Sequence, residues 1–136
     1  MTGPAMGAWD GACHCGTVRF RVEGEVSEVI TCGCSLCAMR NLRMAQVHES
    51  ALTVTAGEAA LALYTWNTGV AQHRFCRLCG VYVFHRKRAA PERFGVNVEC
   101  LTDFDATAFP FRAAEGVDMS VRPEAARPQW RGPREG

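Results

Sequence analysis

The sequence has 136 residues, which is the length of one ordinary domain and enough to bury a hydrophobic core. Hydrophobic residues make up 48% of it and charged residues 21%, which excludes a disordered chain, a collagen or a coiled coil for most of its length. Fifteen basic and fourteen acidic side chains leave a net charge of +1, so we expect no general electrostatic binding of nucleic acid or of anionic membranes.

The beginning of the chain carries no signal for export. Residues 1–9 contain neither a basic segment nor an apolar one, and no apolar run approaches the roughly 18 residues of a membrane-spanning helix. We therefore expect a cytoplasmic protein, in which thiols stay reduced. Eight cysteines in such a protein predict metal ligands or reactive thiols before disulfides.

Alternating apolar and polar residues predict strands along much of the chain. In residues 17–22, Val18, Phe20 and Val22 alternate with polar side chains, which gives a strand one apolar face. Similar short runs follow at residues 44–48, 52–56, 61–66, 72–75, 81–85 and 94–98. The one helix candidate is residues 35–42, with Ser35 in the position of an N-cap. Short strands at this spacing predict a mainly β fold, a sheet sandwich with at most one short helix.

The last part of the chain differs in composition. After residue 120, Arg, Pro, Glu and Gly dominate, so we expect residues 1–120 to form a single domain and residues 121–136 a loosely ordered tail. The basic run at residues 85–88 is expected to be a solvated strand end. We expect His48 and His73 to fill strand positions without a chemical role.

All the cysteines except Cys100 fall in three clusters with one or two residues between neighbouring thiols. This spacing lets a short bent segment direct two sulfurs at one metal ion. The clusters are Cys13 and Cys15; Cys32, Cys34 and Cys37; and Cys76 and Cys79.

The first and third clusters follow one pattern, in which the last cysteine is succeeded by a glycine and an alternating apolar strand. Glycine at that position permits a left-handed turn, which directs backbone N–H groups toward the thiolates. The two clusters therefore look like halves of one site. We predict a closed, structural zinc site made by Cys13, Cys15, Cys76 and Cys79.

The second cluster, Cys32, Cys34 and Cys37, has three sulfurs and no following glycine. Three protein ligands leave a tetrahedral ion with an open position, which is typical of a catalytic zinc. We therefore predict two zinc ions per chain. Two alternatives are open: a fourth ligand from His48, His73, His85 or Cys100 closes the site, or a disulfide forms within the cluster.

The isolated Cys100 follows Phe94, Val96 and Val98 at intervals of two residues, which places all four on one face of a strand. A cysteine in that position is typically a small buried hydrophobic residue. The alternatives are a ligand or a second thiol near the open zinc.

Three segments together resemble the glutathione-dependent formaldehyde-activating enzyme family, also called the centromere protein V/Gfa domain. They are residues 11–20 (GACHCGTVRF), 32–37 (CGCSLC) and 74–80 (RFCRLCG). Residues 97–101 (NVECL) also resemble the last core strand of the family, so the likeness covers about residues 8–105. It implies a zinc-binding, mainly β fold of the beta-tent type, with four structural cysteines and three around a reactive zinc.

The resemblance also implies an activity, the condensation of glutathione with formaldehyde to S-hydroxymethylglutathione, which is classed by its reverse direction as a carbon–sulfur lyase. We expect a zinc-dependent enzyme of this kind, acting on an adduct of an aldehyde with glutathione or another small thiol. Residues 38–40 (AMR) resemble the centromere protein V branch. Arg40 and Arg43 are candidates to pair with glutathione carboxylates, the alternative being exposed arginines at a helix end.

Two other classes of function remain open on the same fold. One is an interaction module with two structural zinc ions, and the other is a thiol redox sensor that uses the second cluster and Cys100. The sequence predicts no oligomeric state.

Overall fold

The computed structural model describes residues 5–32, 39, 43–65, 71–87 and 90–114. Their elements are nine strands and four 3-10 turns of three residues each, so the mainly β prediction is confirmed. The helix predicted at residues 35–42 lies, except for residue 39, outside the described residues. The strands are β1 (Ala5–Ala12), β2 (Arg19–Cys32), β3 (Met44–His48), β4 (Leu52–Ala56), β5 (Leu61–Tyr64), β6 (Gln72–Cys76), β7 (Tyr82–Arg86), β8 (Arg93–Asn97) and β9 (Phe111–Ala114).

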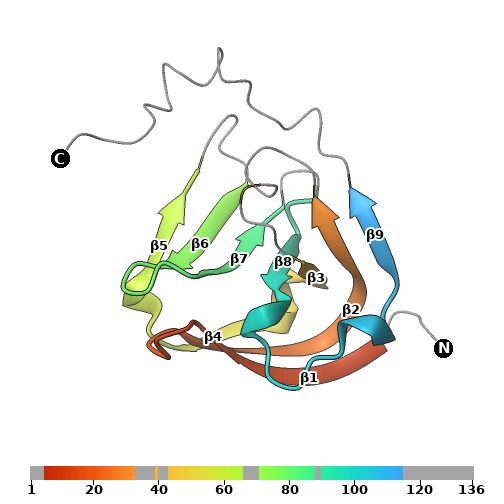
Figure 1. Ribbon diagram of the computed structural model, residues 1–136, viewed down its shortest axis with the longest axis horizontal. Coiled ribbons are helices and arrows are strands. Elements are labelled where there is room, and N and C mark those ends of the chain that lie inside the picture. Colours follow the sequence, from red (N-terminus) through yellow and green to blue (C-terminus); the bar gives the residue numbers. More distant parts are fainter. Residues whose placement is uncertain (1–4, 33–38, 40–42, 66–70, 88–89, 115–136) are drawn as a thin grey trace, which may run out of the picture.

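All nine strands belong to one hydrogen-bonded sheet, in the order β1-β2-β3-β8-β7-β6-β5, with β4 and β9 also paired to β2. Every pairing is antiparallel except that of β2 with β9. Figure 1 shows that the sheet bends strongly, so that β5 and β6 stand over β4 and the start of β2. The facing layers of the predicted sandwich are thus two parts of a single bent sheet.

The long strand β2 is the centre of the fold because it pairs with four other strands along its 14 residues. Its first half pairs with β1 and β4, and its second half pairs with β3 and β9. The predicted strand at residues 17–22 is therefore much longer in the structure. It continues because Val26, Val29 and Ile30 are also fully buried.

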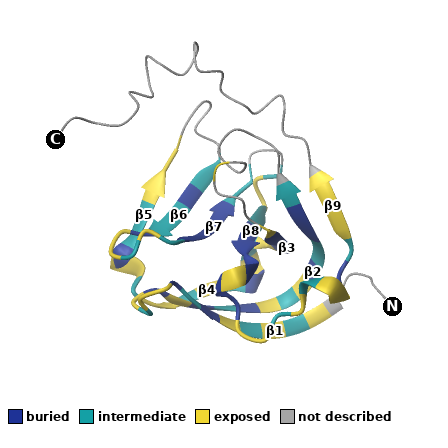
Figure 2. Ribbon diagram, in the orientation of Figure 1, coloured by how far each residue is buried: buried dark blue, intermediate teal, exposed yellow. Residues whose placement is uncertain are grey.

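The main core packs between these layers and consists largely of branched and aromatic side chains. Its fully buried members include Val18, Phe20, Val22, Val26, Val47, Val83 and Val96. Figure 2 shows that burial is greatest in the middle strands β3, β7 and β8, whereas β5 and β9 are largely exposed. The buried alternation of Val18, Phe20 and Val22 is the one predicted from the sequence.

Two strands, β1 and β9, were not predicted. Residues 5–12 are mostly small and alternate weakly, so β1 depends on pairing with β2 at eight positions. It also depends on Trp9, whose ring meets Phe104 and Phe109 edge-on at centroid distances of 5.2 and 5.9 Å. Both contacts are distant in sequence, which explains why no local pattern indicated this strand.

No helix of the described part of the chain is both long enough and apolar enough to cross a bilayer. The tail predicted at residues 121–136 lies outside the described residues, so the proposed domain boundary at residue 120 stays a prediction.

Candidate functional site

Two similar turns bring the first and third cysteine clusters together. After β1, the N–H of Cys13 donates to the carbonyl of Val18 (3.1 Å), and the N–H of Gly16 donates back to the carbonyl of Cys13 (3.1 Å). Gly16 has a φ of +78°, the left-handed conformation that glycine adopts without a steric penalty. The left-handed turn predicted after Cys15 is therefore confirmed.

The turn between β6 and β7 has the same construction. The N–H of Cys76 donates to the carbonyl of Val81 (3.0 Å), and the N–H of Gly80 donates to the carbonyl of Cys76 (2.7 Å). Gly80 also has a φ of +78°. The repeated sequence pattern thus corresponds to a repeated backbone conformation.

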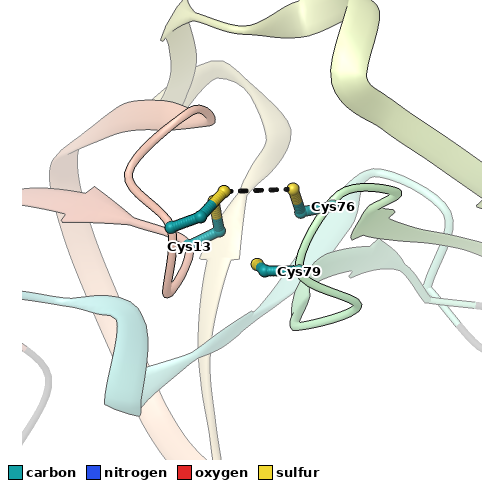
Figure 3. Close-up of side chains that lie close together, drawn as sticks. Cys13, Cys76 and Cys79 are labelled. Atoms are coloured by element: carbon teal, nitrogen blue, oxygen red, sulfur yellow. Dashed lines mark hydrogen bonds between the residues drawn. The ribbon is translucent and has the colours of Figure 1, made fainter.

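The sulfur atoms of all four cysteines in these turns lie within 4.8 Å of one another. The Sγ of Cys15 is 3.6 Å from that of Cys13 and 3.8 Å from that of Cys76. Four sulfurs arranged tetrahedrally at the usual zinc–sulfur distance of about 2.3 Å are separated by about 3.8 Å. Figure 3 shows Cys13, Cys76 and Cys79 converging from the two turns. The cluster therefore has the right size to hold one metal ion.

Hydrogen bonds lower the pKa of two of the four thiols, Cys79 and Cys15. Backbone hydrogen bonds from Val81 and Cys15 lower the pKa of Cys79 to about 6. A hydrogen bond between the Thr17 hydroxyl and the Cys15 sulfur (3.2 Å), together with a backbone bond from Thr17, lowers the pKa of Cys15. Because metals bind the deprotonated sulfur, this environment suits metal ligands.

The four cysteines of the cluster differ in their exposure to solvent. Cys13 and Cys76 are buried, Cys79 is half-buried and Cys15 is exposed. The N–H of Val18 donates to the Cys13 sulfur (3.4 Å), as a backbone group supporting a metal ligand does. Four sulfur donors with no other residue type among them suit a soft metal ion.

The second cluster is only partly within the described chain. Cys32 is the last residue of β2, where its backbone pairs with Ala114 of β9. Cys34, Cys37 and Arg40 lie outside the described residues, so the three-cysteine site stays a prediction. Arg43 lies immediately before β3, and its guanidinium forms an exposed ion pair with Glu99 (3.2 Å).

The residues considered as a fourth ligand of that site have partners of their own. The Nδ1 of His48 accepts from the N–H of Ser50 (3.2 Å) and caps the 3-10 turn Glu49–Ala51. His73 and His85 are buried, and their rings stack with centroids 5.0 Å apart. The expectation that residues 85–88 form a solvated strand end is therefore wrong for His85.

Cys100 is buried, as predicted, but not for the reason given. The strand β8 ends at Asn97, and Cys100 lies in the 3-10 turn Val98–Cys100. Its Sγ lies 3.6 Å from the carbonyl oxygen of Tyr82, to which the thiol donates. Burial, reinforced by the charges of neighbouring Cys13 and Cys79, raises the pKa of this thiol to about 12, which disfavours the thiolate form.

Sequence reasoning missed a buried polar group formed by His73, Tyr82, His85 and Asn97. The amide of Asn97 donates to the carbonyl of Tyr82 (2.9 Å), and Tyr82 hydrogen-bonds His85. No motif marks these residues. Their one signal was the presence of two histidines and a tyrosine within runs otherwise typical of buried strands.

The chain matches the family model described as glutathione-dependent formaldehyde-activating enzyme over residues 8–114, a range that contains all eight cysteines. It is also similar to a solved structure, the crystal structure of a Rhodobacter sphaeroides protein. The two are 37% identical with a TM-score of 0.68, over 76% of this chain and 99% of that one.

Proposed function

Because the chain belongs to the glutathione-dependent formaldehyde-activating enzyme family, we propose that it adds glutathione, or another small thiol, to an aldehyde such as formaldehyde. The product is a thiohemiacetal such as S-hydroxymethylglutathione. In the reverse direction the enzyme is a carbon–sulfur lyase. The match over residues 8–114, which includes every cysteine cluster, is the observation that carries this proposal.

The cofactor proposed is zinc, with two ions per chain. Cys13, Cys15, Cys76 and Cys79 would hold a structural ion, since four protein ligands leave no open position. The cysteines of the second cluster, Cys32, Cys34 and Cys37, would hold the other ion with one open position. An ion of this kind, when bound, stabilises a substrate sulfur as a thiolate.

Arg43 is proposed to bind a carboxylate of the thiol substrate. It borders a hollow of about 400 Å³ whose other lining residues are mostly apolar, such as Val29, Phe109 and Phe111. Its ion pair with Glu99 is exposed, and such pairs are worth about 0–1 kcal/mol. The guanidinium can therefore exchange Glu99 for a substrate carboxylate at little cost. Arg40 is proposed as a second such contact.

The chemical step requires little beyond holding two reactants together. The thiolate sulfur attacks the aldehyde carbon, and the aldehyde oxygen becomes a hydroxyl by taking up a proton. Binding both partners in one site converts a bimolecular addition into an effectively unimolecular one. The localisation proposed is cytoplasmic, where glutathione keeps thiols reduced.

The test compares Cys34→Ser with Cys100→Ser, which removes a thiol outside all three cysteine clusters. Native mass spectra of the reduced protein should show two zinc ions and a glutathione adduct for the wild type and for Cys100→Ser. Cys34→Ser should lose the adduct and at least about 100-fold of the rate of thiol–aldehyde addition above the solution rate.

Two zinc ions without an adduct or any rate above solution would contradict the proposed activity and favour an interaction module. Reversible zinc loss on mild oxidation, without that rate, would favour a redox sensor.

A further inference from the structure

A second hollow, of about 560 Å³, opens between the two facing layers of the bent sheet. One wall comes from β4 and the 3-10 turn Glu58–Ala60, and the other comes from β5, β6, β7 and β8, which stand over β4 in Figure 1. Sites for small molecules usually have volumes of about 300–1,000 Å³. All the lining residues are described and none is a cysteine. This interlayer hollow is therefore a candidate binding site that the cysteine clusters do not form.

The walls of the interlayer hollow are largely apolar. Half of its lining side chains belong to the hydrophobic core or pack against it, namely Leu52, Val54, Leu61, Phe84 and Phe94. Burial of an apolar group against such walls is favourable because it removes apolar surface from water. The hollow therefore suits a ligand with an aliphatic or aromatic body.

One cationic side chain, Arg74, stands on the core side of the sheet. It lies directly opposite Phe84 in the antiparallel pair of β6 and β7, and residues in that relation point to the same side. Phe84 belongs to the core. Arg74 is half-buried, and none of the ion pairs among the described residues includes it. Its partial desolvation thus has a cost that no described carboxylate offsets.

The other arginine of the interlayer hollow, Arg86, is fully engaged. Its guanidinium pairs with Glu49 (3.1 Å) and donates to the carbonyl of Pro91 (2.6 Å). It also lies over the ring of Phe94, 4.9 Å from the centroid. Because these contacts hold and neutralise Arg86, it forms part of a wall, and Arg74 is the cation available to a ligand.

The charges around the interlayer hollow favour a ligand with a single negative charge. Arg74 supplies one positive charge, whereas Glu58, which also lines the hollow, would repel a second negative charge on the ligand. A carboxylate has one charge, and its two oxygens match the fork of N–H donors on a guanidinium. Charge and geometry thus point to the same chemical group.

From this arrangement we propose that the interlayer hollow binds a small carboxylate with an aliphatic or aromatic body. Arg74 binds the carboxylate group, and the apolar walls contact the body. The inference goes beyond the proposed thiol–aldehyde chemistry and does not rest on it, since no cysteine lines the hollow. Its test requires no turnover, so its failure and that of the proposed function are distinguishable.

The test titrates the full-length, reduced protein with three probes that share a phenyl body. They are 4-phenylbutanoate, the neutral 4-phenylbutan-1-ol and, at pH 8, the doubly charged 3-phenylpropyl phosphate. The carboxylate should bind with a Kd of about 1 mM or lower, which is ordinary for a ligand of this size. The alcohol and the phosphate should each bind at least about tenfold more weakly.

Three results of these titrations would overturn the inference. No binding of the carboxylate at about 10 mM would show that the interlayer hollow is not a site for this class. Equal affinity for the alcohol would show that the hollow is merely apolar. Tighter binding of the phosphate would contradict the preference for a single charge.

The place of binding is read from the methyl resonances of leucine labelled with ¹³C. Leu61 lines the interlayer hollow, whereas Leu78 lies outside it and is 66% exposed, so it reports non-specific binding to surface leucines. The resonances are assigned with Leu61→Ile and Leu78→Ile. The carboxylate should move those of Leu61 and leave those of Leu78 in place. Equal shifts at both would overturn the inference.

The role of Arg74 is tested with Arg74→Gln, for which Arg93→Gln is the matched control. Each removes one positive charge, and Arg93, in β8, does not line the interlayer hollow. Arg74→Gln should weaken binding of the carboxylate at least about tenfold and leave binding of the alcohol within about twofold. Arg93→Gln should change neither affinity.

Equal weakening by both variants would overturn the role of Arg74, because it would indicate a general effect of charge. We expect Arg74→Gln to keep the thermal midpoint of the wild type within a few degrees, since Arg74 belongs to no ion pair of the described chain. If this variant does not fold, the comparison of probes on the wild type and its leucine resonances decide the inference.

Discussion

At the scale of single residues, Gly57 and Gly80 have nearly the same left-handed backbone but very different surroundings. Their φ angles are +75° and +78°. A Cβ at Gly57 would lie 2.1 Å from the carbonyl oxygen of Thr17, whereas a Cβ at Gly80 would meet nothing within 4 Å. Substituting alanine at the two positions therefore separates the cost of a steric clash, present at Gly57 alone, from the cost of the left-handed backbone, present at both.

We expect Gly80→Ala to lower the free energy of unfolding by about 1–2 kcal/mol, the cost of a left-handed conformation for alanine. Gly57→Ala should lower it by at least a further 1–3 kcal/mol, because backbone must move to admit the methyl group. Urea denaturation of the metal-saturated proteins measures both values. An equal decrease in the free energy of unfolding for both variants would show that the backbone around Gly57 relaxes freely.

At the scale of elements, the short strand β9 is held to β2 by a two-pronged ion pair as well as by its backbone. Arg112 donates to both carboxylate oxygens of Glu28, at 3.0 and 2.9 Å. This hydrogen-bonded pair lowers the pKa of Glu28 below its ordinary value of 4.5. The Glu28 side chain is 20% exposed, so water screens the pair only in part.

A lowered pKa in the folded protein means that the pair stabilises the fold above pH 4.5 and that this contribution is lost as Glu28 becomes protonated at lower pH. Glu28→Gln should therefore lower the free energy of unfolding by about 1 kcal/mol or less at pH 7. The difference from the wild type should shrink as the pH falls below 4.5. Chemical denaturation of both proteins over a pH series measures this difference in the free energy of unfolding.

Glu23→Gln is the matched control for this series. Glu23 lies on the same strand but is 73% exposed, and its nearest cationic contact, Arg21, is 3.9 Å away. We expect it to change stability little at any pH. If the free energies of unfolding of Glu28→Gln and the wild type differ by the same amount even at a pH where Glu28 is fully protonated, the ion pair does not contribute to stability.

At the scale of the whole molecule, the four-cysteine site joins two distant parts of the bent sheet. One pair of cysteines follows β1, at one end of the strand order, and the other pair lies at the end of β6 and in the turn that follows it, near the opposite end. Cys15 and Cys76 are 61 residues apart. A metal ion at this site would therefore restrain the unfolded chain as well as close the fold.

Removal of the metal should destabilise the protein strongly. By comparison with a disulfide that closes a loop of this length, the constraint alone is worth about 4 kcal/mol. A strong chelator should thus lower the thermal midpoint of the wild type by more than about 10 °C. Cys76→Ser should lower it to a similar extent without chelator, whereas Cys34→Ser should lower it far less. An unchanged midpoint in chelator would contradict a structural metal.

The sequence was most informative where the physical cause is local. The cysteine–glycine turns were predictable, because a glycine after the last cysteine sets the backbone of its own turn, as Gly16 and Gly80 show. The alternation of Val18, Phe20 and Val22 predicted a strand with one buried face, and all three are buried. From these two local signals came the mainly β fold and the pairing of the first cysteine cluster with the third.

Only the tertiary structure decided which residues meet across the sheet. Trp9 holds β1 through Phe104 and Phe109, about a hundred residues away, and no local pattern reports such a contact. An extra residue in β7, at Val83, reverses the alternation that the sequence pattern assumes, and it brings Tyr82 beside His85. By itself the sequence determined the cysteine–glycine turns, the buried face of residues 18–22 and the four cysteines that could hold a metal ion. The bend of the sheet and the buried tyrosine–histidine pair depend on strand register, which long-range pairing sets.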